Sequence, residues 1–122
     1  MFLLSPQTKV FLAKDSTDMR KSFRGLIVLA EAVLNQDPAS GHLFVFVNKR
    51  REMLKILHWD GSGWWIWYRQ LERGTFQLPQ QSATDESGIE LTPSQLSMIL
   101  DGVDLSSVRQ RLRYGQVAGT AK

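Results

Sequence analysis

Three apolar runs of strand length, separated by two polar turns, occupy residues 42–73 of the 122-residue chain. The turns at 48–52 and 60–63 contain the Asn, Asp, Gly and Ser residues that favour short hairpins. A further short run at 75–78 follows a Glu-Arg-Gly turn and ends at Pro79. The pattern predicts an antiparallel meander of four strands in this part of the chain.

These runs carry apolar residues at both even and odd positions. Along residues 43–47, Leu and Val occupy one face and Phe occupies the other. The run at 53–59 is mixed in the same way, and at 64–68 aromatic residues fall on both faces. Strands with two apolar faces are covered on both sides. A helix is therefore expected on one face, and a second layer or a partner on the other.

Apolar residues that recur every three to four positions between Met19 and Leu34 predict one long helix. Residues 9–14 predict a short strand, and Ser16 or Thr17 after it is a suitable N-cap, because its hydroxyl can accept an unpaired backbone N–H. The helix is predicted over residues 18–36 and ends before Pro38. Its buried stripe consists of Met19, Phe23, Leu26, Ile27, Ala30, Val33 and Leu34.

The region beyond residue 79 combines a polar loop with a capped helix. Residues 80–88 are rich in polar and turn-forming types, and residues 89–91 suit a brief added strand. Thr92 is a strong N-cap, and Gln95 stands at the capping-box position three residues later. Gly102 supplies a C-terminal stop. A short helix is therefore predicted between Thr92 and Gly102.

Together the elements predict an α+β fold: a strongly curved antiparallel sheet of about five strands, one long helix packed on it, and a short C-terminal helix. The chain is long enough for one domain with a hydrophobic core. We assign residues 1–105 to this domain. Residues 106–122 carry little apolar content and are expected to form a basic, flexible tail.

Charge is distributed unevenly, although the net charge is only +3. Residues 1–84 carry a net +4, residues 85–104 a net −5 and residues 105–122 a net +4. This distribution suits a polyanion partner, and it equally suits contacts between tail and acidic segment. The chain has no cysteine, as is common in a reducing compartment, and its start matches neither a signal peptide nor a membrane span. We expect a cytoplasmic protein without membrane contact.

No catalytic or metal-binding motif is evident. Both histidines, His42 and His58, fall in predicted strands without a nucleophile motif beside them, and each is expected to be an ordinary strand residue. No His, Asp and Glu spacing matches a metal site. The acids fall mostly in turns and in the acidic segment, which argues against a two-metal nuclease. We expect no enzymatic activity and no cofactor.

Cations gather at the predicted helix start, at the tip of the first hairpin and near the end of the last long strand. Cations at a helix start are disfavoured by the macrodipole, and a bound phosphate would offset this. The candidate nucleic-acid-binding residues are Arg20, Lys21, Arg24, Lys49, Arg50, Arg51, Arg69 and Arg73. Trp65 or Trp67 would stack on bases if exposed. The alternative is a solvated basic surface, with at least two of the four tryptophans in the core.

Five short motifs occur in order within residues 5–104. They are Thr17-Asp18-Met19-Arg20-Lys21-Ser22-Phe23, Gly41-His42-Leu43-Phe44-Val45-Phe46, Lys55-Ile56-Leu57-His58-Trp59-Asp60-Gly61, Leu71-Glu72-Arg73-Gly74-Thr75-Phe76 and Leu91-Thr92-Pro93-Ser94-Gln95-Leu96. Together they resemble the TnpB (Orf2-like) accessory protein of the insertion-sequence 66 family of bacterial mobile elements. His58 departs from the family pattern, where a second aromatic is more usual.

The resemblance implies a non-catalytic accessory role in DNA transposition, beside a separate transposase that carries the catalytic acids. It carries over recognisable positions, such as Asp18, Arg20 and Lys21, but no catalytic residue. DNA is one expected partner, and the transposase with other element-encoded proteins is the other. The alternative function is an interaction module that bridges those proteins through exposed aromatics and the acidic 85–104 segment. The sequence leaves the oligomeric state open.

Overall fold

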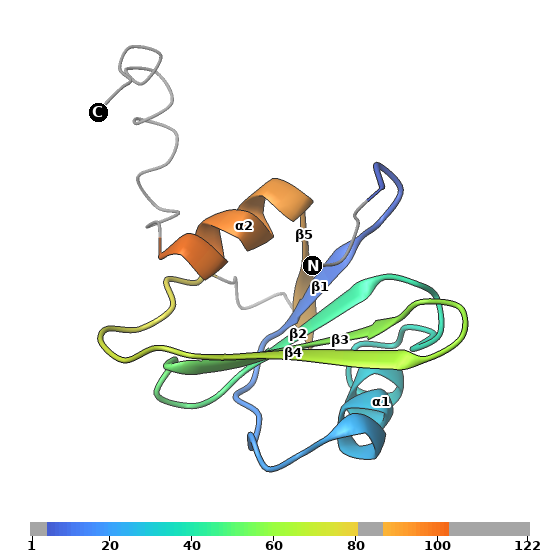
Figure 1. Cartoon of the computed structure of the whole chain (residues 1–122), viewed down its shortest axis with the longest axis horizontal. Coiled ribbons are helices and arrows are strands. Elements are labelled where there is room, and N and C mark those ends of the chain that lie inside the picture. The colour runs from blue at the N-terminus through green and yellow to red at the C-terminus, as the bar shows by residue number, and fades with distance from the viewer. Residues whose placement is uncertain (1–4, 81–86, 103–122) are drawn as a thin grey trace.

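The computed structural model describes residues 5–80 and 87–102 as a five-stranded open sheet with a helix on each side (Figure 1). The α+β class predicted from the sequence is confirmed. The predicted tail at 106–122 and most of the polar loop lie outside the described residues. The elements in chain order are β1 (Val10–Ala13), α1 (Phe23–Ala32), β2 (Leu43–Val47), β3 (Met53–Trp59), β4 (Trp64–Gln70), β5 (Gly88–Leu91) and α2 (Pro93–Asp101).

The strand order is β4-β3-β2-β1-β5. β2, β3 and β4 form the predicted meander, in which Val45 lies opposite Ile56 and Ile56 opposite Trp67. β1, however, pairs in parallel with β2, so the sheet is mixed rather than wholly antiparallel as predicted. The physical reason is the connection: α1 lies between these two strands and returns the chain to the end from which β1 started.

Two apolar clusters, one on each face of the sheet, explain why its strands carry apolar residues on both faces. On one face α1 packs against the Phe side chains of β2, through Ala13, Leu26, Ala30, Leu34, Phe44, Phe46 and Leu57. On the other face α2 and the segment after β4 complete a cluster of Val10, Leu12, Leu43, Val45, Val47, Leu54, Ile56, Phe76, Leu91, Leu96 and Ile99. The predicted coverage of both faces is confirmed, and both covering layers belong to this chain.

The long helix is confirmed, but α1 starts five residues later and ends four residues earlier than the 18–36 span predicted. Its N-cap is Ser22, whose side chain makes no capping hydrogen bond, and neither Ser16 nor Thr17 caps it. Thr17 is instead buried, and its backbone N–H donates to the Val47 carbonyl at 2.9 Å. Residues 17–21 are therefore held against the end of the sheet, where they cannot form the first helical turn.

The segment 75–78 is not a strand, contrary to the prediction. It crosses the end of the β2–β3 hairpin, buries Phe76, and donates one backbone hydrogen bond from Phe76 to Arg51. The α2 boundaries are confirmed: the Thr92 hydroxyl accepts from the Gln95 N–H at 3.1 Å, and the Gln95 side chain accepts from the Thr92 N–H at 2.9 Å. Neither described helix is long and apolar enough to cross a membrane.

Candidate nucleic-acid interface

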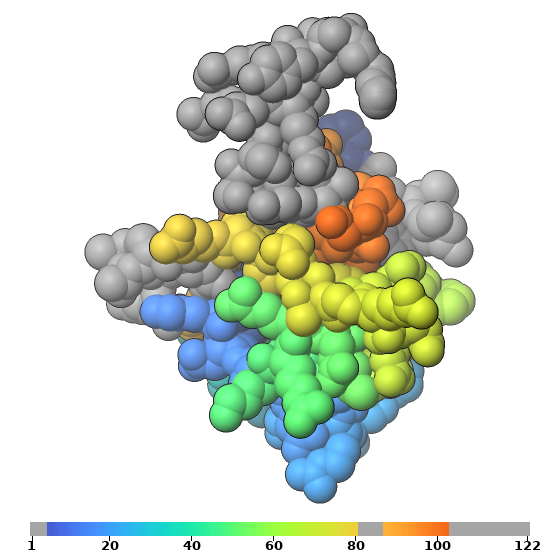
Figure 2. Space-filling model, turned by 90° about the vertical axis from the view of Figure 1, so that its left-hand side faces the viewer, coloured from blue at the N-terminus to red at the C-terminus, as the bar shows by residue number. Residues whose placement is uncertain are grey.

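The sheet topology brings most of the candidate cations to one end of the molecule. β1, β2 and β4 run in the same direction, because β1 is parallel to β2 and β3 is antiparallel to both β2 and β4. The segments that follow these three strands therefore meet at one end of the sheet (Figure 2), where the green hairpin tip lies between the blue segment after β1 and the yellow segment after β4. We call this end the basic end. Its cations are Lys14, Arg20, Lys21, Lys49, Arg50, Arg51, Arg69 and Arg73.

The hairpin tip is a tightly closed turn. The Asn48 side-chain oxygen accepts the backbone N–H groups of Glu52 at 2.9 Å and Met53 at 3.0 Å. Arg51 adopts a positive φ of 58° and donates its N–H to the Asn48 carbonyl. Because the backbone of the turn is fixed, the exposed side chains of Lys49 and Arg50 project from a rigid base.

A buried lysine holds the segment after β1 against the sheet. The Lys55 ammonium donates to the carbonyl oxygens of Met19 at 2.8 Å and of Lys21 at 2.7 Å, and it lies 4.8 Å from the centre of the Tyr68 ring. Lys55 lies in β3 and is only 8% exposed, which is unusual for a charged side chain. It therefore stabilises the backbone that carries Arg20 and Lys21, rather than offering a charge to a ligand.

Arg20 is partly neutralised by a neighbouring acid. Its guanidinium forms an ion pair with Asp18 at 2.7 Å, and its backbone N–H donates to the same carboxylate at 2.9 Å. The side-chain hydrogen bond from Arg20, followed by the backbone one, lowers the pKa of Asp18 to about 2. Lys21, which is exposed beside it, is the stronger candidate for an anion contact in this segment.

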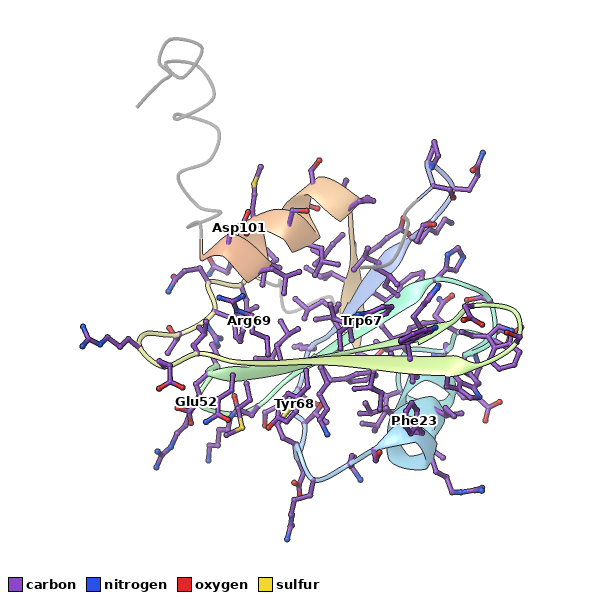
Figure 3. The ribbon with its side chains drawn as sticks, in the orientation of Figure 1. Phe23, Glu52, Trp67, Tyr68, Arg69 and Asp101 are labelled. Atoms are coloured by element: carbon purple, nitrogen blue, oxygen red, sulfur yellow. The ribbon has the colours of Figure 1, made fainter. Side chains whose placement is uncertain are left out.

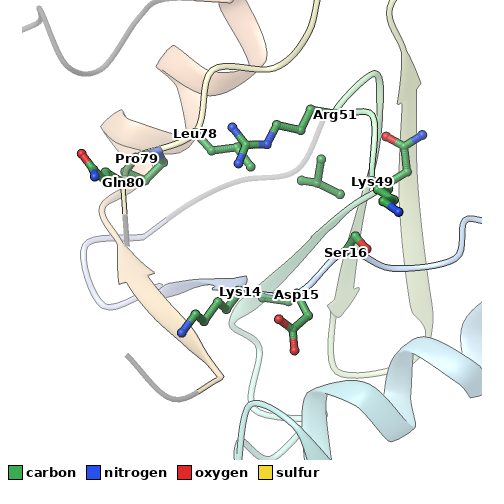
Figure 4. Close-up of a pocket in the computed structure, with 11 residues that line it drawn as sticks. Lys14, Asp15, Ser16, Lys49, Arg51, Leu78, Pro79 and Gln80 are labelled. Carbon is green, nitrogen blue, oxygen red and sulfur yellow. The ribbon is translucent and has the colours of Figure 1, made fainter. Parts of the chain in front are cut away.

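Two grooves flank the hairpin tip. The first, of about 450 Å³, lies between the tip, the end of β1 and residues 78–80, and Lys14, Lys49 and Arg51 contribute to its walls (Figure 4). The second, of about 600 Å³, is more open and lies between the tip and residues 16–19. Both grooves include Lys49 in their lining, so this side chain stands at their junction.

Of the remaining candidate cations, Arg69 and Arg73 lie at the basic end and Arg24 lies in α1. Arg69 lies opposite Leu54 near the end of β4, on the α2 side of the sheet, and Figure 3 shows Tyr68 pointing to the other side. Arg73 is exposed in the turn that follows. Arg24 lies in the first turn of α1, beyond the segment that follows β1, so we do not count it with the basic end.

One cation of the basic end was missed from the sequence. Lys14 directly follows β1 and lines the first groove, together with Asp15. The signal that could have placed it is its position: a parallel β1–β2 pair puts the residue after β1 beside the turn after β2. With Lys14 included, eight cations face four acids at this end, a formal excess of four positive charges. The acids are Asp15, Asp18, Glu52 and Glu72.

The tryptophans do not extend the basic end. Trp64 and Trp67 are partly buried and pack against the two core clusters, although neither belongs to the fully buried core. Trp65 is half exposed, but its ring stacks on Trp67 at 5.5 Å and its indole N–H donates to Asp60 at 2.7 Å. Trp65 lies four residues before Arg69, or about 13 Å along the strand. Base stacking beside the basic cations is therefore not supported.

Asp60 organises the opposite end of β4. Its carboxylate accepts the backbone N–H groups of Ser62 and Gly63, both at 2.8 Å, as well as the indole N–H of Trp65. The backbone hydrogen bond from Ser62 and the hydrogen bond from Trp65 lower the pKa of Asp60 to about 2. The carboxylate is thus an acceptor that fixes the β3–β4 turn, and the negative charge stays at this end of the strand.

The acidic and histidine side chains of the described residues are dispersed. Within 5–80 and 87–102, no group of three or more His, Asp or Glu side chains is placed to hold a metal ion. His42 accepts a hydrogen bond from the Lys9 backbone N–H at 3.0 Å and stacks edge-on against Phe11, as expected of an ordinary strand residue.

Fold and charge thus define a small α+β domain with one cationic end. The chain belongs to the family of IS66 Orf2-like proteins, whose family model matches residues 8–110. It is 35% identical over 96 residues to the uncharacterized protein y4hO of Sinorhizobium fredii (strain NBRC 101917 / NGR234), covering 79% of this chain and 81% of the relative.

A second relative is similar over most of the chain. The uncharacterized protein y4jC of the same organism is 30% identical over 103 residues, covering 84% of this chain and 86% of that protein. No solved structure matches the chain. The family suggests an accessory role in the transposition of insertion sequences, and it is not a known family of enzymes.

Proposed function

We propose that this protein is a non-catalytic accessory factor for transposition and that it binds DNA through the basic end. The observation that carries the proposal is the meeting of three separate basic segments at one end of the sheet. Lys49 and Arg50 project from a rigid turn, and the grooves on either side of the tip give a backbone of phosphates a place to lie.

The contacts expected are to phosphates rather than to bases. The cations of this end lie in turns and loops and at the end of a strand, and the exposed indole of Trp65 lies at the other end of β4. Lysine and arginine side chains on turns contact phosphates without reading sequence. Of the eight cations at this end, we expect about five to contact phosphates, since Asp18 already pairs with Arg20 and the other acids compete.

A salt titration tests the proposal quantitatively. Five phosphate contacts give a slope of about −4.5 in a plot of log K against log salt, so affinity for a duplex should fall about 500-fold between 50 and 200 mM salt. A labelled duplex with the sequence of the element's ends, and a scrambled duplex of equal length, should bind with similar affinity if contacts are to phosphates.

Two variants of equal charge change make the test specific to the tip. Replacing both Lys49 and Arg50 with Ala lowers the net charge by two, and so does Lys9→Glu at the start of β1, on the opposite end of the sheet. The tip variant should lower the salt slope by about 2, whereas the control should leave it within about 0.5. No binding at low salt, or equal effects of both variants, would contradict the proposal.

A second candidate function is a bridge between the transposase and other element-encoded proteins. It is favoured by the exposed Trp65 and Tyr68 on β4, and by exposed acids at Glu90 and Asp101. A pull-down with the element's other proteins, with and without DNase, separates the two functions. Retention of a partner after DNase treatment supports the bridge, and its loss supports attachment through DNA.

A further inference from the structure

β4 forms one edge of the sheet, and its outer side is open in the described structure. The strand order ends at β4, and Figure 1 shows it as the front strand with no labelled helix or strand in front of it. Five of its seven residues are the consecutive apolar and aromatic residues Trp64 to Tyr68. Open edges of this length invite pairing with another strand unless something protects them.

The hydrogen bonds at the two ends of β4 show which backbone groups are free. The Asp60 N–H bonds to the Gly63 carbonyl, and the Leu71 N–H bonds to the Glu52 carbonyl. In an antiparallel pair the hydrogen-bonded residues alternate with those whose N–H and C=O point outward. Counting from these two bonds, the outward groups of β4 belong to Trp64, Ile66, Tyr68 and Gln70.

The usual protections of an edge strand are weak along most of β4. It contains no proline, its register against β3 runs without interruption from Trp64 to Gln70, and its only charged residue is Arg69. Trp65 and Tyr68, on opposite faces of the strand, are 50% and 52% exposed. Large aromatic side chains on both faces favour a partner strand that contacts the two faces together.

We propose that β4 pairs antiparallel with β4 of a second copy of this chain, around a two-fold axis at Trp67. In this register, Ile66 of one copy and Tyr68 of the other form a hydrogen-bonded pair, because the N–H and C=O groups of both residues point outward from the sheet. Trp67 then faces Trp67 of the second copy as a close pair, with Cα atoms about 4.5 Å apart. It is the register that pairs all seven residues of the strand.

The side chains of β4 are complementary to themselves in this register. Trp65 lies opposite Arg69 of the second copy, which places a guanidinium beside an exposed indole. Trp65 and Trp67 already stack within one copy at 5.5 Å, so the pairing extends this stack across the axis. At the two ends, the Asp60 turn of one copy approaches the end of β4 that carries Arg69 and Arg73. Opposite charges at the two ends of one strand favour antiparallel pairing with itself.

The dimer would join two sheets into one ten-stranded sheet. Because the strands are antiparallel, the two basic ends would point in opposite directions. If DNA binds there, which rests on the proposed function, one dimer would hold two DNA segments. The pairing itself does not depend on DNA, so its test is separate. An interface built on one strand edge is small, and we expect dissociation in the micromolar range.

Sedimentation equilibrium of the full chain from about 1 to 300 μM tests the dimer, and two variants at one position test its register. Trp65→Lys places a lysine opposite Arg69 of the second copy, whereas Trp65→Glu places a carboxylate there. Both remove the same ring and its bond to Asp60. Because Glu and Lys interact differently with the Asp60 carboxylate, urea unfolding of each variant is measured beside the sedimentation, and the comparison is made where both are fully folded. The dissociation constant should be at least about 10-fold higher for the Lys variant than for the Glu variant.

Cross-linking gives a second readout, because the chain has no cysteine of its own. Trp67→Cys should form a disulfide-linked dimer under mild oxidation, since the paired Cα atoms fall within disulfide range. Glu90→Cys, on the opposite edge strand β5, is the control and should stay monomeric. A monomeric wild type at all concentrations, equal dimerisation of the Lys and Glu variants, or cross-linking through Glu90→Cys alone would overturn the proposal.

Discussion

Replacing Lys55 with Met tests how the basic end is built. Met keeps the unbranched apolar stem of the side chain but removes the ammonium that donates to the carbonyls of Met19 and Lys21 at 2.8 and 2.7 Å. It also removes the cation beside the Tyr68 ring, at 4.8 Å. The segment that precedes α1 then has no side chain to tie these two carbonyls to the sheet.

The expected cost follows from these contacts. Hydrogen bonds from a charged group contribute about 1.5–3 kcal/mol each, but Lys21 is exposed, so water can replace part of what is lost. Burying the ammonium also costs free energy, which the variant regains. We expect a net loss of about 2 kcal/mol in the free energy of unfolding, or a melting temperature lower by about 10 °C.

Thermal and urea unfolding of Lys55→Met measure this loss, with Lys9→Met as the control that removes an exposed positive charge. Hydrogen exchange adds a local readout: the Lys21 amide, which donates to the Asp18 carbonyl at 3.1 Å, should exchange faster in the variant. If Lys55→Met is as stable as the control and the exchange of the Lys21 amide is unchanged, the Lys55 ammonium does not hold the segment before α1 against the sheet.

Three further predictions concern single contacts. Because the pKa of Asp60 is lowered to about 2 in the folded chain, its contribution to stability is complete above about pH 4 and is lost as the pH falls toward 2. Urea unfolding of the wild type and of Asp60→Asn should therefore show a stability difference that shrinks over that pH range. Gly88→Ala should destabilise by at least about 2 kcal/mol, because its Cβ would lie 2.4 Å from the Leu12 carbonyl oxygen, and a normal melting temperature would refute the crowding. Thr92→Ala should cost about 1 kcal/mol in urea unfolding through loss of the bond to the Gln95 N–H, and Thr92→Ser should restore most of it.

Local patterns in the sequence predicted the elements whose cause is local. The alternation along 43–47, 53–59 and 64–68 predicted both faces of the meander, because side chains in a strand point to its two faces in turn. The capping box at Thr92 and Gln95 likewise predicted the start of α2, since both partners lie within one helical turn.

The errors have long-range causes. The parallel pairing of β1 with β2 depends on how α1 packs, and no short pattern encodes strand direction. The late start of α1 reflects Lys55, which lies more than 30 positions away and donates hydrogen bonds to two carbonyl oxygens before the helix. The segment 75–78 has the composition of a strand, but it buries Phe76 against the core and crosses the hairpin instead of joining the sheet.

The candidate site likewise has a part that local sequence predicts and a part that depends on long-range contacts. The cations were found from their types and from the turns that hold them, whereas their grouping required the strand directions. Lys14 was missed because the sequence alone does not show which end of the sheet a residue faces, and Arg24 stays a prediction.

The most direct test of the central claim is a map of the DNA contacts on the protein. Amide chemical shifts of the ¹⁵N-labelled chain, followed while a short duplex is added at low salt, report each residue separately. We expect changes in the segments that follow β1, β2 and β4, namely residues 14–21, 48–52 and 69–74, with little change at Lys9, at the opposite end of the sheet. Changes spread evenly over the surface, or centred on α1 and α2, would contradict a DNA-binding basic end.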